Sequence, residues 1–137
     1  MIASGSDALE AIAIANERVV AMSRDLRATP GVTAVLHGAE CRRYQSGGRV
    51  ECYLDIETDW KESLCWWLEI GWDETWSVDA KLYAQEDSGQ REVQTFANIR
   101  TGDVDGLVNA LAGAVDAIAA SVATFDPGRP QDRSDRS

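Results

Sequence analysis

The chain has 137 residues, of which 45% are apolar and 26% charged, so it can bury the core of one globular domain and is too apolar to be disordered throughout. Its 23 acidic and 13 basic side chains give a net charge of −10, which disfavours nucleic acid and anionic membranes as partners and favours a basic protein. The first residues show no signal peptide, no stretch of about 18 uncharged apolar residues is present to span a membrane, and the three cysteines lack metal-site spacing. We therefore expect a cytoplasmic protein without a metal or cofactor.

A first helix is predicted for residues 7–27. Asp7 and Glu10 have the spacing of a capping box, which marks the start of a helix. A Thr-Pro-Gly sequence at 29–31 ends it. Apolar residues recur at helical spacing at Leu9, Ile12, Val19 and Leu26.

Five strands are predicted to follow. The first starts as a β-branched run at 32–36 and leads toward Tyr44, and a Ser-Gly-Gly turn at 46–48 precedes the second. Residues 50–57, 64–72 and 76–84 carry an apolar side chain at every second position, which is typical of strands with one buried face, and 92–100 form the fifth strand. The residues assigned to the buried face include Cys52, Leu54, Ile56, Trp66, Leu68, Ile70, Trp72, Trp76, Val78, Val93, Thr95, Ala97 and Ile99.

A second helix begins after Asp103, its predicted N-cap, and carries an apolar stripe from Val104 to Phe125. Both helices are rich in alanine, which would let them pack side by side on one face of the sheet; the alanines could instead be helix filler or form a homodimer contact. The expected fold is α+β, a five-stranded antiparallel meander with an N-terminal and a C-terminal helix on one face and the other face exposed. Residues 1–125 form one domain, and 126–137 read as a disordered tail.

Strand register follows from the rule that buried-face residues must pair with one another. With a three-residue loop at 73–75 this rule sets Trp72 opposite Trp76, and a hairpin near Ser88 sets Lys81 opposite Phe96. Between the second and third strands it favours Glu51 opposite Glu69, with shifts of two residues left open. Two bands then cross the exposed face. The aromatic band is Tyr53–Trp67–Lys81–Phe96, in which the lysine is placed for a cation–π contact. The acidic band is Glu51–Glu69–Asp79–Asn98.

Negative charge is concentrated near these bands. Nine acids lie between positions 51 and 79 against a single base, Lys61: Glu51, Asp55, Glu57, Asp59, Glu62, Glu69, Asp73, Glu74 and Asp79. The face could be a solvated surface, a docking surface for a cationic partner, or carboxylates bridged by a divalent metal. For docking, the candidate contact residues are Glu51, Tyr53, Asp55, Trp60, Trp67, Glu69, Asp79, Lys81 and Phe96.

The sequence offers little for catalysis. His37 is the single histidine, and no nucleophile motif, phosphate-binding loop or zinc motif accompanies it. Cys41 and Cys52 flank the first hairpin and are expected to lie opposite each other facing inward, either as two small buried side chains or as a disulfide or redox pair. A non-enzymatic protein is therefore favoured.

The helix–meander–helix outline is similar to small bacterial immunity proteins and to secretion-chaperone-like domains. This resemblance implies a binding module, such as an inhibitor that covers a basic toxin. The alternatives are a chaperone-like or dimeric scaffold acting through the alanine-rich helices, and a small-ligand binder or enzyme.

Overall fold

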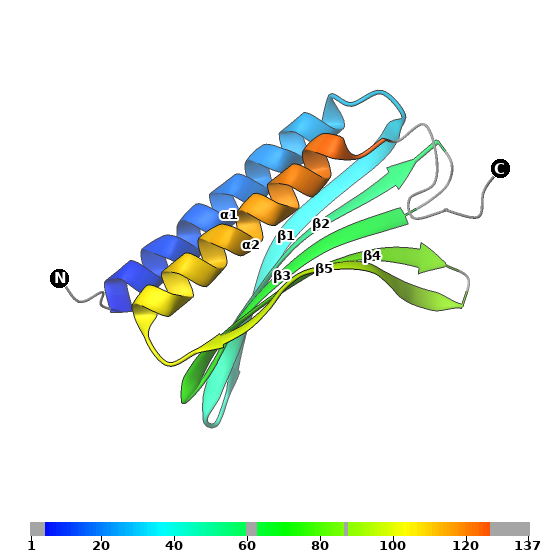
Figure 1. Cartoon of the computed structure of the whole chain (residues 1–137). Helices are drawn as coiled ribbons and strands as arrows, with labels where there is room; N and C mark the ends of the chain where they lie inside the picture. Colours follow the sequence, from blue (N-terminus) through cyan, green and yellow to red (C-terminus); the bar gives the residue numbers. More distant parts are fainter. Residues whose placement is uncertain (1–4, 60–62, 87, 127–137) are drawn as a thin grey trace.

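The computed structural model describes residues 5–59, 63–86 and 88–126, and it confirms the predicted α+β fold with a meander sheet. The strands form one antiparallel sheet in the order β1-β2-β3-β4-β5 (Figure 1). The elements are α1 (Gly5–Arg27), β1 (Val32–Tyr44), β2 (Gly47–Thr58), β3 (Ser63–Asp73), β4 (Thr75–Glu86), β5 (Gly89–Thr101) and α2 (Val104–Thr124).

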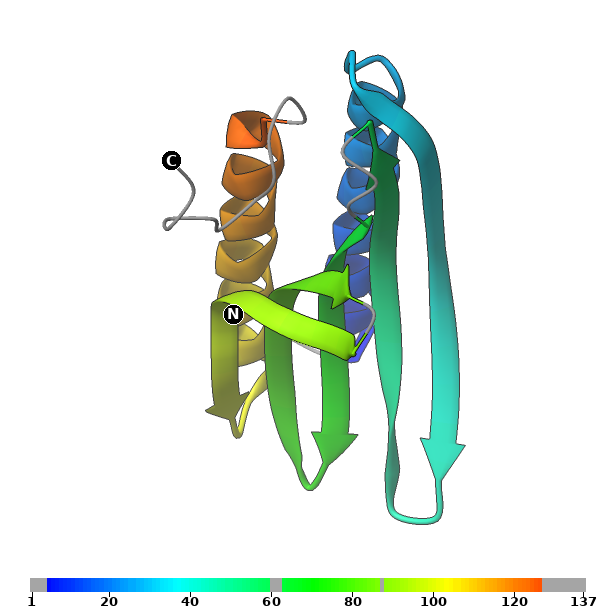
Figure 2. The same ribbon diagram turned by 90° about the vertical axis from the view of Figure 1, so that its right-hand side faces the viewer.

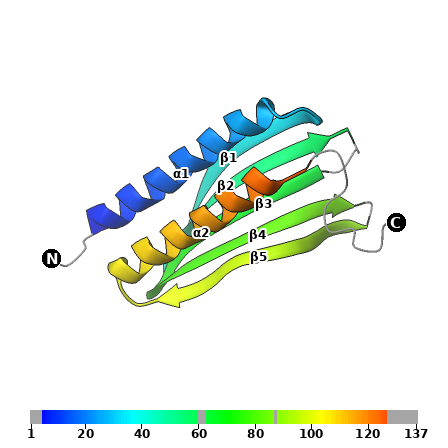
Figure 3. The same cartoon turned by 45° about the horizontal axis from the view of Figure 1, so that its top comes forward.

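Both helices cover the same face of the sheet and run in the same direction, because an odd number of antiparallel strands separates them (Figures 1 and 3). α1 packs on β1 and β2, and α2 packs on β3, β4 and β5. The helices also contact each other, as expected, and Arg18 Nη1 lies 2.7 Å from Asp116 Oδ1 across them. Among the described helices only α2 is long and apolar enough to cross a membrane, a property shared by core helices of soluble proteins.

The core lies between the sheet and the helices. Its largest fully buried side chain is that of Trp66 in β3, which is 2% exposed. The indole Nε1 donates a hydrogen bond to Ser121 Oγ at 2.9 Å, and the ring meets that of Phe125 edge to face at 5.6 Å between centroids. Trp66 therefore connects the centre of the sheet to the C-terminal end of α2.

The helix starts show one correct and one wrong prediction. Asp103 is the N-cap of α2, since its carboxylate accepts a hydrogen bond from the Gly106 amide at 2.6 Å. The capping box at Asp7 is wrong, because α1 begins at Gly5 and Asp7 lies in its first turn. Leu9, assigned to the apolar stripe, is 71% exposed, whereas the neighbouring Ala8 is 2% exposed. Successive helical residues are about 100° apart, so burying the small side chain turns the large one outward.

The register at the centre of the sheet is as predicted. Tyr53 pairs with Trp67 and Glu51 with Glu69 between β2 and β3. Trp72 pairs with Trp76 between β3 and β4, where their rings are 6.1 Å apart. The alternation of buried and exposed side chains excluded shifts of one residue, and the turn lengths selected among the registers that remained.

The pairing of Lys81 with Phe96 is wrong. Asp79 does pair with Asn98, but the register shifts between Ala80 and Lys81, so that Lys81 faces Thr95. This irregularity moves Thr95 to the exposed face and leaves Phe96 partly buried against the core. A bulge adds one residue to one strand and reverses the facing of those beyond it.

The predicted pairing of Cys41 with Cys52 is also wrong. β1 and β2 extend to Tyr44 and Gly47, leaving a two-residue turn where four residues were expected. The shorter turn shifts the register by two, so that Cys41 faces Val50 and Ala39 faces Cys52. All three cysteines are free: Cys41 is exposed and Cys52 is buried.

Candidate functional site

The face of the sheet opposite the helices carries the candidate site (Figure 2). Its centre is aromatic. Trp67 on β3 and Tyr83 on β4 are half-buried and meet edge to face, with ring centroids 6.2 Å apart. Tyr53 on β2 extends over Gly38 of β1, because a Cβ at that glycine would overlap the tyrosine hydroxyl. A Tyr–Trp–Tyr surface therefore spans β2 to β4, and its third aromatic is Tyr83 on β4 rather than Phe96 on β5.

A row of carboxylates runs beside these aromatics. Glu51, Glu69 and Asp79 lie directly opposite one another on β2, β3 and β4, as predicted. Glu40 of β1 pairs with Glu51 and extends the row to the edge strand. Like charges directly opposite on a sheet are destabilising, so the row requires a compensating charge.

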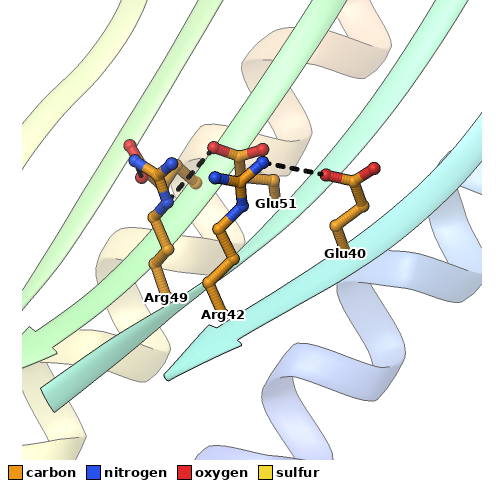
Figure 4. A network of polar contacts seen from close by, with 5 residues as sticks. Glu40, Arg42, Arg49 and Glu51 are labelled. Atoms are coloured by element: carbon orange, nitrogen blue, oxygen red, sulfur yellow. Dashed lines mark hydrogen bonds and ion pairs between the residues drawn. The ribbon is translucent and has the colours of Figure 1, made fainter. Parts of the chain in front are cut away.

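That charge is Arg49, which the sequence reasoning missed. Its Nη1 lies 3.1 Å from Glu69 Oε1 and its Nε lies 3.4 Å from Glu51 Oε1, so one guanidinium links two strands of the acidic row. Figure 4 shows this cluster with Arg42, whose Nη2 lies 3.9 Å from Glu40 Oε2. Arg49 precedes Glu51 by two residues on β2, so strand periodicity alone puts both on one face. Arg49 lies two residues before Glu51, outside the acidic segment 51–79.

Burial raises the pKa of the Glu69 carboxyl above its usual value. Arg49 opposes this shift, while the negative charges of Glu51 and Asp79 add to it. The side chain of Glu69 is 16% exposed, which is why loss of water outweighs the attraction of the guanidinium. The raised pKa means that the charged form of Glu69 is less favourable in the folded protein than in the unfolded chain.

Lys81 lies on the exposed face as predicted, but its partner differs from the expected aromatic ring. Its Nζ lies 3.0 Å from Glu92 Oε1 of β5, and the hydrogen bond with Glu92 raises the pKa of Lys81. The cation–π contact found in the described residues belongs to Arg49, whose guanidinium carbon lies 5.9 Å from the centroid of Tyr44.

The remaining candidates lie at the other end of the face. Asp55 on β2 lies opposite Cys65 on β3 and is hydrogen-bonded to its thiol. Burial raises the pKa of Cys65, and burial raises that of Cys52 to about 11, so neither thiol is a reactive thiolate at neutral pH. Trp60, the other predicted contact residue, lies outside the described residues.

The acidic row ends in a shallow cavity of about 360 Å³ at the end of the sheet near the first hairpin. Arg49, Glu69, Asp79 and Arg100 contribute to its wall, so both signs of charge meet there. Within the described residues, no group of three or more His, Cys, Asp or Glu side chains could hold a metal ion. The arrangement is one of ion pairs across strands rather than of carboxylates converging on a cation.

No protein-family model matches the chain, and neither the curated proteins nor the solved structures gave a match.

Glu69→Gln tests the charge balance of the row. The pKa of Glu69 is higher in the folded protein than in the unfolded chain. Between these two pKa values the folded protein therefore binds more protons at Glu69 than the unfolded chain does. The free energy of unfolding falls as the pH rises through this range. Glutamine removes this term and can still accept the hydrogen bond of Arg49. We expect the variant to equal or exceed the parent in stability at pH 7, with the difference shrinking below pH ~4.

Urea denaturation at both pH values provides the measurement, with Glu57→Gln, an exposed carboxylate on β2, as the control. A loss of stability at pH 7 confined to Glu69→Gln would mean that its bond to Arg49 outweighs burial and repulsion.

Proposed function

We propose that this protein is a non-enzymatic binding module that docks a basic protein on the uncovered face of its sheet, in the manner of an immunity or inhibitor protein. The observation that carries the proposal is the half-buried Trp67–Tyr83 pair at the centre of that face, with carboxylates on both sides. Exposed aromatics that can be fully desolvated are typical interface anchors, and surrounding charges favour a partner of opposite sign.

The charge of the face supports a cationic partner despite its internal ion pairs. Arg49 offsets part of the charge of Glu51 and Glu69, and Lys81 offsets that of Glu92. Arg42 and Arg100 add two further cations to this face. Six carboxylates against these four cations still leave an excess of negative charge: Glu40, Glu51, Asp55, Glu69, Asp79 and Glu92. With a net charge of −10 for the whole chain, the field attracts a basic surface from a distance.

Two variants test the proposal once a basic partner has been captured from the native host. Replacing Glu51, Glu69 and Asp79 together by Gln should slow association and flatten its dependence on salt, because the acids act mainly on the encounter. Trp67→Ala should instead speed dissociation, weakening binding by about 2 kcal/mol or more if the indole is an anchor. Surface plasmon resonance at two salt concentrations separates these effects. Parent-like binding by both variants would eliminate the sheet face as the interface.

A second candidate function, a chaperone-like or dimeric scaffold, is supported by the outer side of the helices. Ala11, Ile14 and Ala15 of α1 face Val108, Leu111 and Ala112 of α2 across a small cavity of about 150 Å³. Ile14, which lines this cavity together with Arg18, is 49% exposed, so a large apolar side chain is accessible there. Ile14→Asp should abolish binding of a partner to the helix surface without affecting a partner held by the sheet face. Pulldown with Ile14→Asp and with Trp67→Ala therefore distinguishes the two surfaces.

A further inference from the structure

The two edges of the sheet differ in their protection against pairing with another strand. β5 is irregular at two places, between Ala80 and Lys81 and between Leu82 and Tyr83 in its pairing with β4. β1 is irregular only at its start, between Val32 and Ala34, and then pairs regularly with β2 as far as Tyr44. Bulges are a common device for protecting an edge, so β1 is the edge that remains open to a further strand.

The open stretch of β1 lies on a hairpin that projects beyond the start of the helices, as Figures 1 and 2 show. Residues 39–44 of β1 are all exposed, and β2 is the one strand paired with β1 in the described chain. Neither helix therefore obstructs the approach of another strand at this end.

Backbone geometry limits how a second strand can join. Tyr44 and Gly47 flank the two-residue turn, so they form a hydrogen-bonded pair. Counting back from Tyr44, every second residue of β1 directs its backbone N–H and C=O groups to β2. The residues between them, among which are Ala39, Cys41 and Arg43, direct their backbone N–H and C=O groups toward the open edge. A strand pairing there must also keep exposed-face residues opposite exposed-face residues.

We propose that two copies of this chain pair antiparallel through β1, with Cys41 on the two-fold axis, to form one sheet continuous across both copies. In this register Glu40 of each copy lies opposite Arg42 of the other. Tyr44 of each lies opposite Gly38 of the other, where it meets the ring of Tyr53 that extends over that glycine. Registers centred on Glu40 or Arg42 place like charges opposite each other, and one centred on Ala39 pairs Leu36 with Arg42.

The side chains needed for this pairing are available in the single chain. Arg42 and Glu40 are 58% and 55% exposed, and their closest N–O distance of 3.9 Å within β1 is long. In the dimer each would instead find an opposite charge directly across the strand pair, which is the arrangement that stabilises antiparallel ladders. The pairing uses neither Trp67 nor Tyr83, so it does not depend on the aromatic pair at the centre of the proposed docking face.

Sedimentation equilibrium of the whole chain tests the dimer. We expect a concentration-dependent dimer that Glu40→Arg weakens by about tenfold or more, because two attractive pairs become repulsive. Adding Arg42→Glu to this variant reverses both charges and should restore the parent affinity. Glu57→Arg is the matched control, since it makes the same change in net charge at an exposed position on β2 outside the pairing.

A short bis-maleimide provides a second readout, because each maleimide adds one thiol across its double bond. The exposed Cys41 should be linked to Cys41 of the second copy, giving a covalent dimer on a denaturing gel that Cys41→Ser abolishes. Burial keeps Cys52 and Cys65 largely protonated and unreactive. A monomer at all concentrations would overturn the proposal, and so would a dimer that withstands Glu40→Arg but dissociates with Ile14→Asp.

Discussion

Trp66→Ala should destabilise the protein by about 3–5 kcal/mol, the range measured when large aromatic side chains are removed from cores. The indole is 2% exposed and contacts both the ring of Phe125 and the hydroxyl of Ser121, so alanine leaves a cavity between β3 and α2. Guanidinium chloride denaturation, followed by far-UV circular dichroism, gives the free energy of unfolding. A cost below about 1 kcal/mol would show that α2 does not pack on this part of the sheet.

The adjacent residue provides a matched control. Trp67 is the same residue type one position later, so it faces the uncovered side of the sheet, where it is half-buried against Tyr83. Trp67→Ala should cost about 1 kcal/mol, the size of one aromatic pair. Trp66→Phe separates packing from hydrogen bonding, because it keeps most of the ring and removes the bond to Ser121, worth about 1 kcal/mol.

The contrast between these tryptophans also explains why so much of the fold was predictable. Along β2, β3 and β4, buried side chains alternate with less buried ones, and a shift of one residue would bury charges such as Glu69. That penalty leaves few registers, so the pairing of Glu51 with Glu69 and of Trp67 with Lys81 could be derived from sequence. The predicted positions of Tyr53 and Asp79 on the exposed face follow from the same constraint.

The errors arise where that constraint is weak. The bulge opposite Lys81 depends on how an edge strand twists, and no residue type near Phe96 marks it. The exposure of Leu9 depends on how closely α1 approaches its neighbours, which is a property of the packed molecule. Arg49 could have been found, because its spacing from Glu51 already placed both side chains on one face.

Gly47→Ala should destabilise the protein by about 3 kcal/mol, at the upper end of the cost of inserting a methyl group into a packed site. A Cβ on Gly47 would overlap the backbone carbonyl oxygen of Trp72, where the start of β2 passes the end of β3. Backbone atoms cannot rotate away as a side chain can, so the strands must separate at this end. Arg49 would then be drawn away from Glu69, because the two lie on the strands that the methyl group separates.

Gly113→Ala is the control of opposite sign. Gly113 lies on the exposed side of α2, and a Cβ there would meet no atom within 4 Å. Alanine should therefore stabilise the protein by about 0.5–1 kcal/mol, because glycine loses more backbone entropy in a helix. Thermal unfolding of both variants should give midpoints on opposite sides of the parent. If Gly47→Ala unfolds at the parent midpoint, β2 and β3 are further apart at this end, and Arg49 is not held between Glu51 and Glu69 by the close approach of the two strands.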